Sequence, residues 1–236
     1  MESPTSWKAS AAVACYVAVL VGILVGSILV VTVILGLGID YQELTFPSSL
    51  LSLPITEGII FGVTLFFARQ KHATLRDLGL KKPSLKTILT VTVAAIFLIF
   101  VAVSISVVEE AVLGPDPMAE ELLYALLPQD TFQLLLLVGL SIFLVGPAEE
   151  LAFRGFIQRG LENSYGKTAG LVFASVLFGL LHGLNSLRSI IPVTVLSLFL
   201  GYVWQKTDYN TTACAWMHGL YDAITITVAY LAATAI

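Results

Sequence analysis

Residues Leu134–Phe156, LLLLVGLSIFLVGPAEELAFRGF, are almost wholly apolar, and only Glu149, Glu150 and Arg154 bring charge into them. About 20 consecutive apolar residues suffice for a helix to cross a bilayer, so the stretch predicts a transmembrane helix. A charged side chain near the bilayer centre costs about 2.5–3.5 kcal/mol on insertion scales, and such residues mark functional sites by default. These charged residues are therefore the first candidates for a functional site.

The composition of the whole chain agrees with a membrane location. Of its 236 residues, 57% are hydrophobic and 12% are charged, whereas soluble domains carry about 25% charged residues. The mean hydropathy is +0.92. These values predict an all-α, polytopic transmembrane helical bundle without a large soluble domain. The net charge of -4 argues against a nucleic-acid partner.

Apolar runs along the chain predict about seven membrane spans, with six and eight as the limits. The first run, Ala11–Ile39, is longer than the apolar region of a signal peptide, so we expect it to be retained. Pro54 and Glu57 interrupt the second run, and a short interfacial helix is expected over Met118–Leu127. The predicted spans are 11–37, 49–68, 87–108, 131–153, 168–183, 189–205 and 212–235.

The basic residues predict the orientation of the bundle. Cytoplasmic loops collect Lys and Arg. With the N-terminus inside, every Lys and Arg except Arg188 falls on the inner side. Seven spans then place the C-terminus outside. The basic loop 69–86 fits this role in setting the topology, and attraction of anionic lipid headgroups is the alternative.

Two later apolar runs also carry polar residues, and the three clusters share one spacing. Residues four apart lie on the same face of a helix. Each cluster therefore points in one direction from its own helix. The pairs are Glu150 with Arg154, Phe178 with His182, and His218 with Asp222.

The two adjacent glutamates must have different surroundings, because neighbouring residues on a helix lie about 100° apart. Either Glu150 pairs with Arg154 while Glu149 faces a cavity, or the roles are reversed. Gly146 and Pro147 precede the pair, and proline removes a backbone donor and kinks a helix. Such a break at membrane depth is tolerated where it lines a cavity, so we expect an aqueous pocket beside Glu149.

The side chains of these clusters suit hydrolysis. A glutamate can act as general base on a water, a histidine can hold that water or a metal, and a second histidine can stabilise an oxyanion. Alternatively, His182, His218 and a glutamate would form a zinc site with an open position for water. The spacing does not choose between these mechanisms.

Each cluster alone also has a non-catalytic interpretation. Glu150 with Arg154 would be a structural ion pair, His182 a helix-packing residue, and His218 with Asp222 a hydrogen-bonded pair between helices. The conjunction of all three clusters favours a functional site.

A thiol mechanism is the less favoured alternative. Cys214, His218 and Asp222 follow at intervals of four, but adjacent turns of one straight helix leave the cysteine little freedom to attack a substrate. Cys15 and Cys214 are far apart in sequence and imply no disulfide. We expect packing or interface roles for Glu57, Asn185 and Thr194.

Together the motifs resemble the signature of the CPBP family of intramembrane proteases, which includes type II CAAX prenyl endopeptidases and bacteriocin-processing and immunity proteins. The resemblance covers roughly residues 130–235. We expect N-terminal transmembrane helices and a basic loop in residues 1–130, and the protease core, formed by the last four spans, in residues 131–236. The motifs are Glu149-Glu150-x-x-x-Arg154, Phe178-x-x-x-His182 and His218-x-x-x-Asp222.

The resemblance implies roles for the motif residues. Glu149 matches the family's catalytic, water-activating glutamate, and Glu150 and Arg154 match the remainder of the first motif. His182 matches the histidine that shares the catalytic water or a metal. If the metal is Zn²⁺, the implied ligands are Glu149, His182 and His218.

The third motif departs from that of the prenyl endopeptidases. His218 and the residue at 222 match the pair thought to stabilise the oxyanion, where those enzymes typically have Asn and this chain has Asp222. An ionised Asp cannot donate a hydrogen bond, so Asp222 would orient His218, ligate a metal or be protonated. This departure weakens the expectation of CAAX cleavage more than that of protease chemistry.

We therefore expect an intramembrane endopeptidase that cuts a peptide bond near a membrane-anchored segment, with prenylated CAAX C-termini as candidate substrates. The expected location is the plasma membrane of a prokaryote, with the N-terminus in the cytoplasm. One alternative is a non-catalytic immunity or regulatory membrane protein that binds a partner. The other is a small transporter that uses the polar clusters as an ion path.

This topology does not place the three motifs at one depth in the membrane. Glu149 would lie toward the cytoplasmic end of its helix, and His218 lies about 10 Å from the inner start of its span, at 1.5 Å per residue. His182, however, ends a span that runs outward. Either that span begins deeper, or spans 168–183 and 189–205 form a re-entrant unit.

Overall fold

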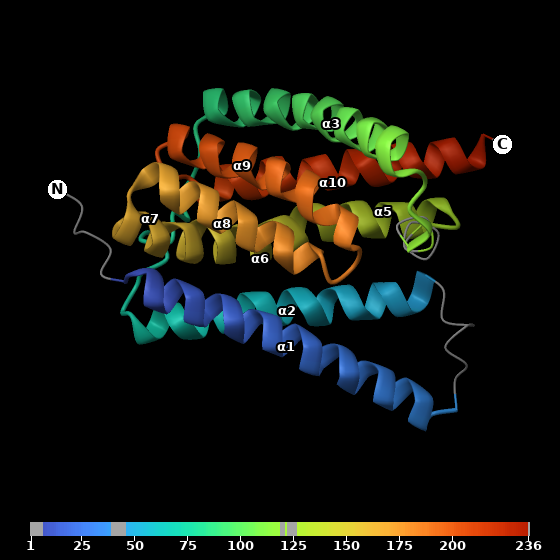
Figure 1. Ribbon diagram of the computed structural model, residues 1–236, viewed down its shortest axis with the longest axis horizontal. Helices are drawn as coiled ribbons and strands as arrows, with labels where there is room; N and C mark the ends of the chain where they lie inside the picture. Colours follow the sequence, from blue (N-terminus) through green and yellow to red (C-terminus); the bar gives the residue numbers. More distant parts are fainter. Residues whose placement is uncertain (1–6, 39–45, 119–120, 122–126, 236) are drawn as a thin grey trace.

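The computed structural model describes residues 7–38, 46–118, 121 and 127–235, and this part of the chain contains helices and no strand. The helices run along the long axis of an elongated bundle (Figure 1). The expected interfacial helix over 118–127 lies mostly outside the described residues. Six of the long helices are α1 (Ala9–Gly36), α2 (Phe46–Gln70), α3 (Leu85–Leu113), α8 (Lys167–His182), α9 (Ile190–Lys206) and α10 (Thr211–Thr234).

The seventh long helix runs from Thr131 to Tyr165. We call it the central rod, because it lies between the pair α1 and α2 on one side and α3 and α10 on the other (Figure 1). It carries both glutamates of the first motif. Its consecutive segments are α5 (Thr131–Leu140), η2 (Ser141–Val145), α6 (Gly146–Glu150), η3 (Leu151–Gln158) and α7 (Arg159–Tyr165).

The predicted all-α polytopic bundle is confirmed. Each of the seven predicted spans corresponds to one long helix, and five of these are long and apolar enough to cross a membrane: α1, α2 from Ser52, α3, the central rod, and α9 with the short turn before it. Helix α8 is apolar but has only 16 residues. Helix α10 has 24 residues and is not among the five; His218 and Asp222 lower its apolarity.

The central rod extends beyond the predicted end at residue 153. The polar residues after that point suggest a loop, yet their side chains find partners on neighbouring segments. Gln158 Nε2 and Gln205 Nε2 donate to Glu162 Oε1 at 2.7 and 2.8 Å, and Asn163 Nδ2 donates to the Trp7 carbonyl at 3.0 Å. The helix therefore continues to Tyr165, because its polar face is covered.

The rod remains helical across Pro147, where the sequence predicted a kink. Two π-helical segments, η2 and η3, flank the short α6 that holds Glu149 and Glu150. A π turn contains more residues than an α turn, so it changes the direction in which the following side chains point. Such insertions occur frequently at functional sites.

The length of the rod brings Glu149 and His182 to similar distances from the turn that joins the rod to α8. Glu149 lies about 16 residues, or about 24 Å at 1.5 Å per residue, from the end of the rod at Tyr165. The chain turns at Gly166, which has φ +83°, and α8 returns over about the same length to His182. Both residues therefore lie at about the same distance from this turn, and α8 and α9 pack against each other.

Two apolar clusters join the N-terminal helices to the rest of the bundle. In the first, which includes residues of α1, α2, the rod and α8, Trp7 stacks on Phe156 with ring centroids 5.0 Å apart. In the second, Val91 and Leu98 of α3 pack with residues of α9 and α10, including Met217. Packing therefore crosses the division expected at residues 130 and 131.

Two glycines let the central rod and α10 approach backbone to backbone. A Cβ atom at Gly146 would lie 2.5 Å from the Ala215 carbonyl oxygen, and one at Gly219 would lie 2.5 Å from the Ser141 carbonyl oxygen. Neither carbonyl belongs to a flexible side chain that could move aside. This contact sets the distance between the first and third motifs.

We predict that Gly219→Ala lowers the free energy of unfolding by about 1–3 kcal/mol, because the added methyl group overpacks the crossing. The matched control is Gly139→Ala on the central rod, where a Cβ meets nothing within 4 Å. That change should be neutral or stabilising by up to about 1 kcal/mol, since alanine favours helix. Thermal unfolding in detergent compares the two variants. Equal stability would contradict the close crossing.

Candidate active site

Glu150 and Arg154 form an ion pair in the interior of the bundle. Arg154 Nη1 lies 3.0 Å from Glu150 Oε1, and their side chains are 1% and 0% exposed. The residues are four apart on one helix, as the spacing predicted. Of the two divisions left open by the sequence, the structure has Glu150 as the partner of the arginine.

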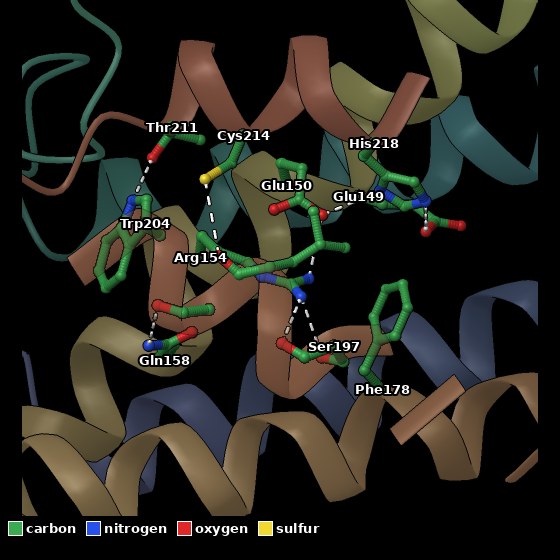
Figure 2. Close-up of polar contacts among 12 residues, drawn as sticks. Glu149, Glu150, Arg154, Gln158, Phe178, Ser197, Trp204, Thr211, Cys214 and His218 are labelled. Carbon is green, nitrogen blue, oxygen red and sulfur yellow. Dashed lines mark hydrogen bonds and ion pairs between the residues drawn. The ribbon is translucent and has the colours of Figure 1, made fainter. Parts of the chain in front are cut away.

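Two other helices hold the guanidinium in place. Arg154 Nη2 donates to the backbone oxygen and to Oγ of Ser197 in α9, at 3.1 and 2.9 Å. Its Cζ lies 5.0 Å from the ring centroid of Phe178 in α8. Figure 2 shows the guanidinium between these contacts and the glutamate. Phe178 therefore takes part in the network as a cation–π partner.

His218 of α10 lies between the two glutamates (Figure 2). Its Nδ1 is 2.9 Å from Glu150 Oε1, and its Nε2 is 3.8 Å from Glu149 Oε2. Nδ1 carries the hydrogen, because the carboxylate of Glu150, ion-paired to the arginine, accepts. Glu150 therefore orients the histidine and leaves its Nε2 toward the second carboxylate.

His182 faces the same carboxylate from α8. Its Nδ1 lies 3.0 Å from the backbone oxygen of Phe178, which can only accept, so Nδ1 is the donor. The Nε2 atom is 4.0 Å from Glu149 Oε1. In the neutral ring, Nε2 therefore presents a lone pair toward Glu149, and the side chain remains 27% exposed.

Asp222 completes the group from the next turn of α10. Its Oδ2 lies 3.6 Å from His218 Nε2. All of the atoms that converge here, the oxygens of Glu149 and Asp222 and the imidazole Nε2 atoms, are acceptors when the acids are ionised and the rings neutral. The arrangement therefore requires protons, a water or a cation between them.

A cavity of about 620 Å³ opens at this point, and Glu149, His182 and Asp222 line it. Glu149 Oε2 has no hydrogen-bond partner among the described residues. The expected pocket beside Glu149 is therefore present. The structure brings all six predicted site residues together, with Glu150 and Arg154 behind the wall and Glu149 on it.

Two further polar residues lie on the cavity wall, although the sequence predicted packing or interface roles for them. Glu57 of α2 and Asn185, in the turn after α8, both line the cavity. Thr194, by contrast, packs against Gly179, as predicted. The sequence feature that identified Glu149 as a candidate, an acidic residue within an apolar run, applies to Glu57 as well.

The structure disfavours the thiol mechanism. Cys214 is fully buried, and its Sγ lies 3.7 Å from the Leu200 carbonyl oxygen in α9. It is not among the residues that line the cavity. Both Cys15 and Cys214 are free thiols.

Zinc remains a prediction for this site. Glu149, His182 and His218 offer carboxylate oxygen and imidazole nitrogen, which zinc accepts. Within residues 7–38, 46–118, 121 and 127–235, however, no three His, Cys, Asp or Glu side chains are arranged to hold a metal ion. We therefore derive no chemical step through a metal.

The fold and the site together define a polytopic helical membrane protein with a hydrolytic set of side chains in an internal cavity. Residues 130–224 match the model of a family described as type II CAAX prenyl endopeptidase Rce1-like. The matched segment contains every predicted site residue, and its similarity to this family agrees with the CPBP resemblance. Neither the curated proteins nor the solved structures contain a match.

The apolar helices and the match together support an integral membrane protein, and the match is with a family of CAAX-type intramembrane proteases. The match begins just before the central rod and ends within α10. Helices α1, α2 and α3 lie outside it.

We predict that Arg154→Met destabilises the fold by about 3–5 kcal/mol, because it leaves the charge of Glu150 buried without a partner. The matched control is Lys81→Ala, which removes an ion pair with Asp208, whose side chain is 92% exposed. Exposed pairs contribute about 0–1 kcal/mol. Chemical denaturation of both variants in detergent measures the difference, and similar small losses would contradict a structural role for the buried pair.

Proposed function

We propose that this protein hydrolyses a peptide bond inside the membrane with a water activated by Glu149. The observation that carries the proposal is the position of Glu149 on the cavity wall. Its two oxygens face the Nε2 atoms of His182 and His218 at 4.0 and 3.8 Å. These separations are too long for direct hydrogen bonds and suit one small molecule between the groups.

The proposed first step uses this water as the nucleophile. The water donates one hydrogen bond to Nε2 of His182 and transfers its other proton to Glu149 as its oxygen bonds to the scissile carbonyl carbon. His182 positions the water because its own Nδ1 is held by the Phe178 carbonyl. The products of this step are a tetrahedral oxyanion and a protonated Glu149.

His218 would stabilise that oxyanion as an imidazolium. Its Nδ1–H donates to Glu150, and a proton on Nε2 would face the acceptor oxygens of Glu149 and Asp222. Asp222 is an acceptor in this scheme and orients His218. When the C–N bond breaks, Glu149 returns its proton to the departing amine, which restores the carboxylate.

We further propose a membrane-anchored peptide as the substrate, with prenylated CAAX-type C-termini as the candidates. Besides the polar groups, the cavity wall includes apolar side chains such as Ile23, Leu24 and Leu181, which suit a lipid chain or an apolar segment. The family match supports the same class of substrate.

For the orientation, we propose a cytoplasmic N-terminus in a prokaryotic plasma membrane. Basic residues gather at one end of the bundle. Lys8 Nζ donates to the Asn163 carbonyl near the end of the central rod. Arg159 and Lys167 both lie over the ring of Tyr209, which precedes α10. This clustering agrees with the excess of positive charge in cytoplasmic loops.

We predict that the purified protein cleaves a quenched farnesylated CAAX-type peptide and that Glu149→Ala lowers the rate by about 10²–10⁴-fold, the range for loss of a general base. Cys214→Ser is the matched control and should retain activity, because the thiol does not face the cavity. A chelator arm with zinc add-back tests for a metal requirement.

Cleavage by Glu149→Ala at the wild-type rate would contradict the proposed mechanism. Binding of the peptide without cleavage by the wild type would favour the non-catalytic regulatory or immunity role. Uptake that depends on an ion gradient, with no peptide product, would favour a transporter.

A further inference from the structure

Glu57 is an acidic residue in the interior of the bundle that the mechanism above does not use. It lies within α2 and outside the segment that matches the family. The residue is only 2% exposed. Its carboxyl oxygen Oε2 is buried and has no hydrogen-bond partner among the described residues. A buried polar atom without a partner destabilises a fold, so its presence calls for an explanation.

The position of Glu57 points to the substrate. It lines the same cavity as Glu149, His182 and Asp222, and it is close enough to interact electrostatically with Glu149, His218 and Asp222. Helix α2 thus supplies a wall of the cavity that the matched segment does not.

A second cavity of about 190 Å³ lies between α1 and α2 and shares part of its wall with the first. Ile23, Ser27, Ser52 and Thr56 line both cavities. The second cavity continues along residues such as Val30 and Ile59. A peptide that places an apolar anchor between α1 and α2 and its scissile bond at Glu149 would therefore pass Glu57.

An extended peptide in such a cavity loses water from its backbone N–H and C=O groups, and each buried group needs a partner. A carboxyl oxygen without a donor matches a backbone N–H in chemistry, because the oxygen accepts and the N–H donates. The acceptor function does not depend on whether the other oxygen of the carboxyl group carries a proton.

We propose that Glu57 is a substrate-binding residue whose Oε2 accepts a hydrogen bond from a backbone N–H of the peptide, between its apolar anchor and the bond that is cut. The inference rests on the proposed function, since it assigns the substrate contact of the same site. It adds a binding group from α2 to the motif residues of the central rod, α8 and α10.

The test compares Glu57→Leu, Glu57→Gln and Thr64→Ala in the peptide-cleavage assay, with thermal unfolding of each variant. Glu57→Leu removes the acceptor and should raise KM about ten-fold, the factor for one lost hydrogen bond, with kcat unchanged. Glu57→Gln keeps an acceptor oxygen and should restore KM. Glu57→Leu should also be at least as thermally stable as the wild type, because it removes a buried atom without a partner.

Thr64→Ala is the matched control on the same helix. Thr64 is fully buried and donates to the Ile60 carbonyl at 2.7 Å, but it does not line the cavity. Its KM should equal that of the wild type. An unchanged KM in Glu57→Leu would overturn the proposal, whether or not the variant is less stable than the wild type.

A binding measurement separates this proposal from the proposed function. Fluorescence polarisation of a labelled farnesylated peptide on the Glu149→Ala background reports affinity without cleavage. If Glu57→Leu weakens binding there, the substrate contact holds even if the wild type does not cleave this peptide. Wild-type cleavage with equal binding by both Glu57 variants would overturn the contact alone. A wild type that neither binds nor cleaves the peptide would overturn both.

Discussion

The buried ion pair between Glu150 and Arg154 is the interaction on which the rest of the site depends. With 1% and 0% exposure, neither charge could remain without the other. The Glu150 oxygen that pairs with the arginine, Oε1, also accepts the hydrogen bond from Nδ1 of His218. The arginine in turn fastens α9 through Ser197 and α8 through Phe178. The two residues of the ion pair thereby join the central rod to α8, α9 and α10. The adjacent Glu149 remains on the cavity wall.

The backbone supports this division between the two glutamates. The π-helical segments on either side of α6 allow a membrane-depth helix to contain Pro147 and two acids without a loop. The glycine crossing with α10 brings His218 within reach of both acids. The long rod and the short α8 then bring His182 to about the same distance from their shared turn as Glu149. The chemistry is therefore positioned by helix lengths and by close helix contacts, more than by loops.

Much of this site was predictable because it is built from helices. The spacing of four in each motif identified the residues that share a face, and apolar length located all seven helices. The end of the central rod was not predictable, because the polar residues Glu162 and Asn163 find partners from α9 and from the segment before α1 only in the folded bundle. Glu57 and Asn185 were assigned to packing for a related reason. The cavity wall that α2 and the turn after α8 form depends on tertiary packing, which no local pattern encodes.

The two adjacent glutamates have separate roles, one chemical and one structural. A parallel measurement of unfolding free energy and peptide hydrolysis for Glu149→Gln and Glu150→Gln tests this division. We expect Glu149→Gln to keep wild-type stability and lose hydrolysis, and Glu150→Gln to lose stability because Arg154 becomes a buried charge without a counter-ion. A stable, fully active Glu150→Gln protein together with an unfolded Glu149→Gln protein would contradict this division.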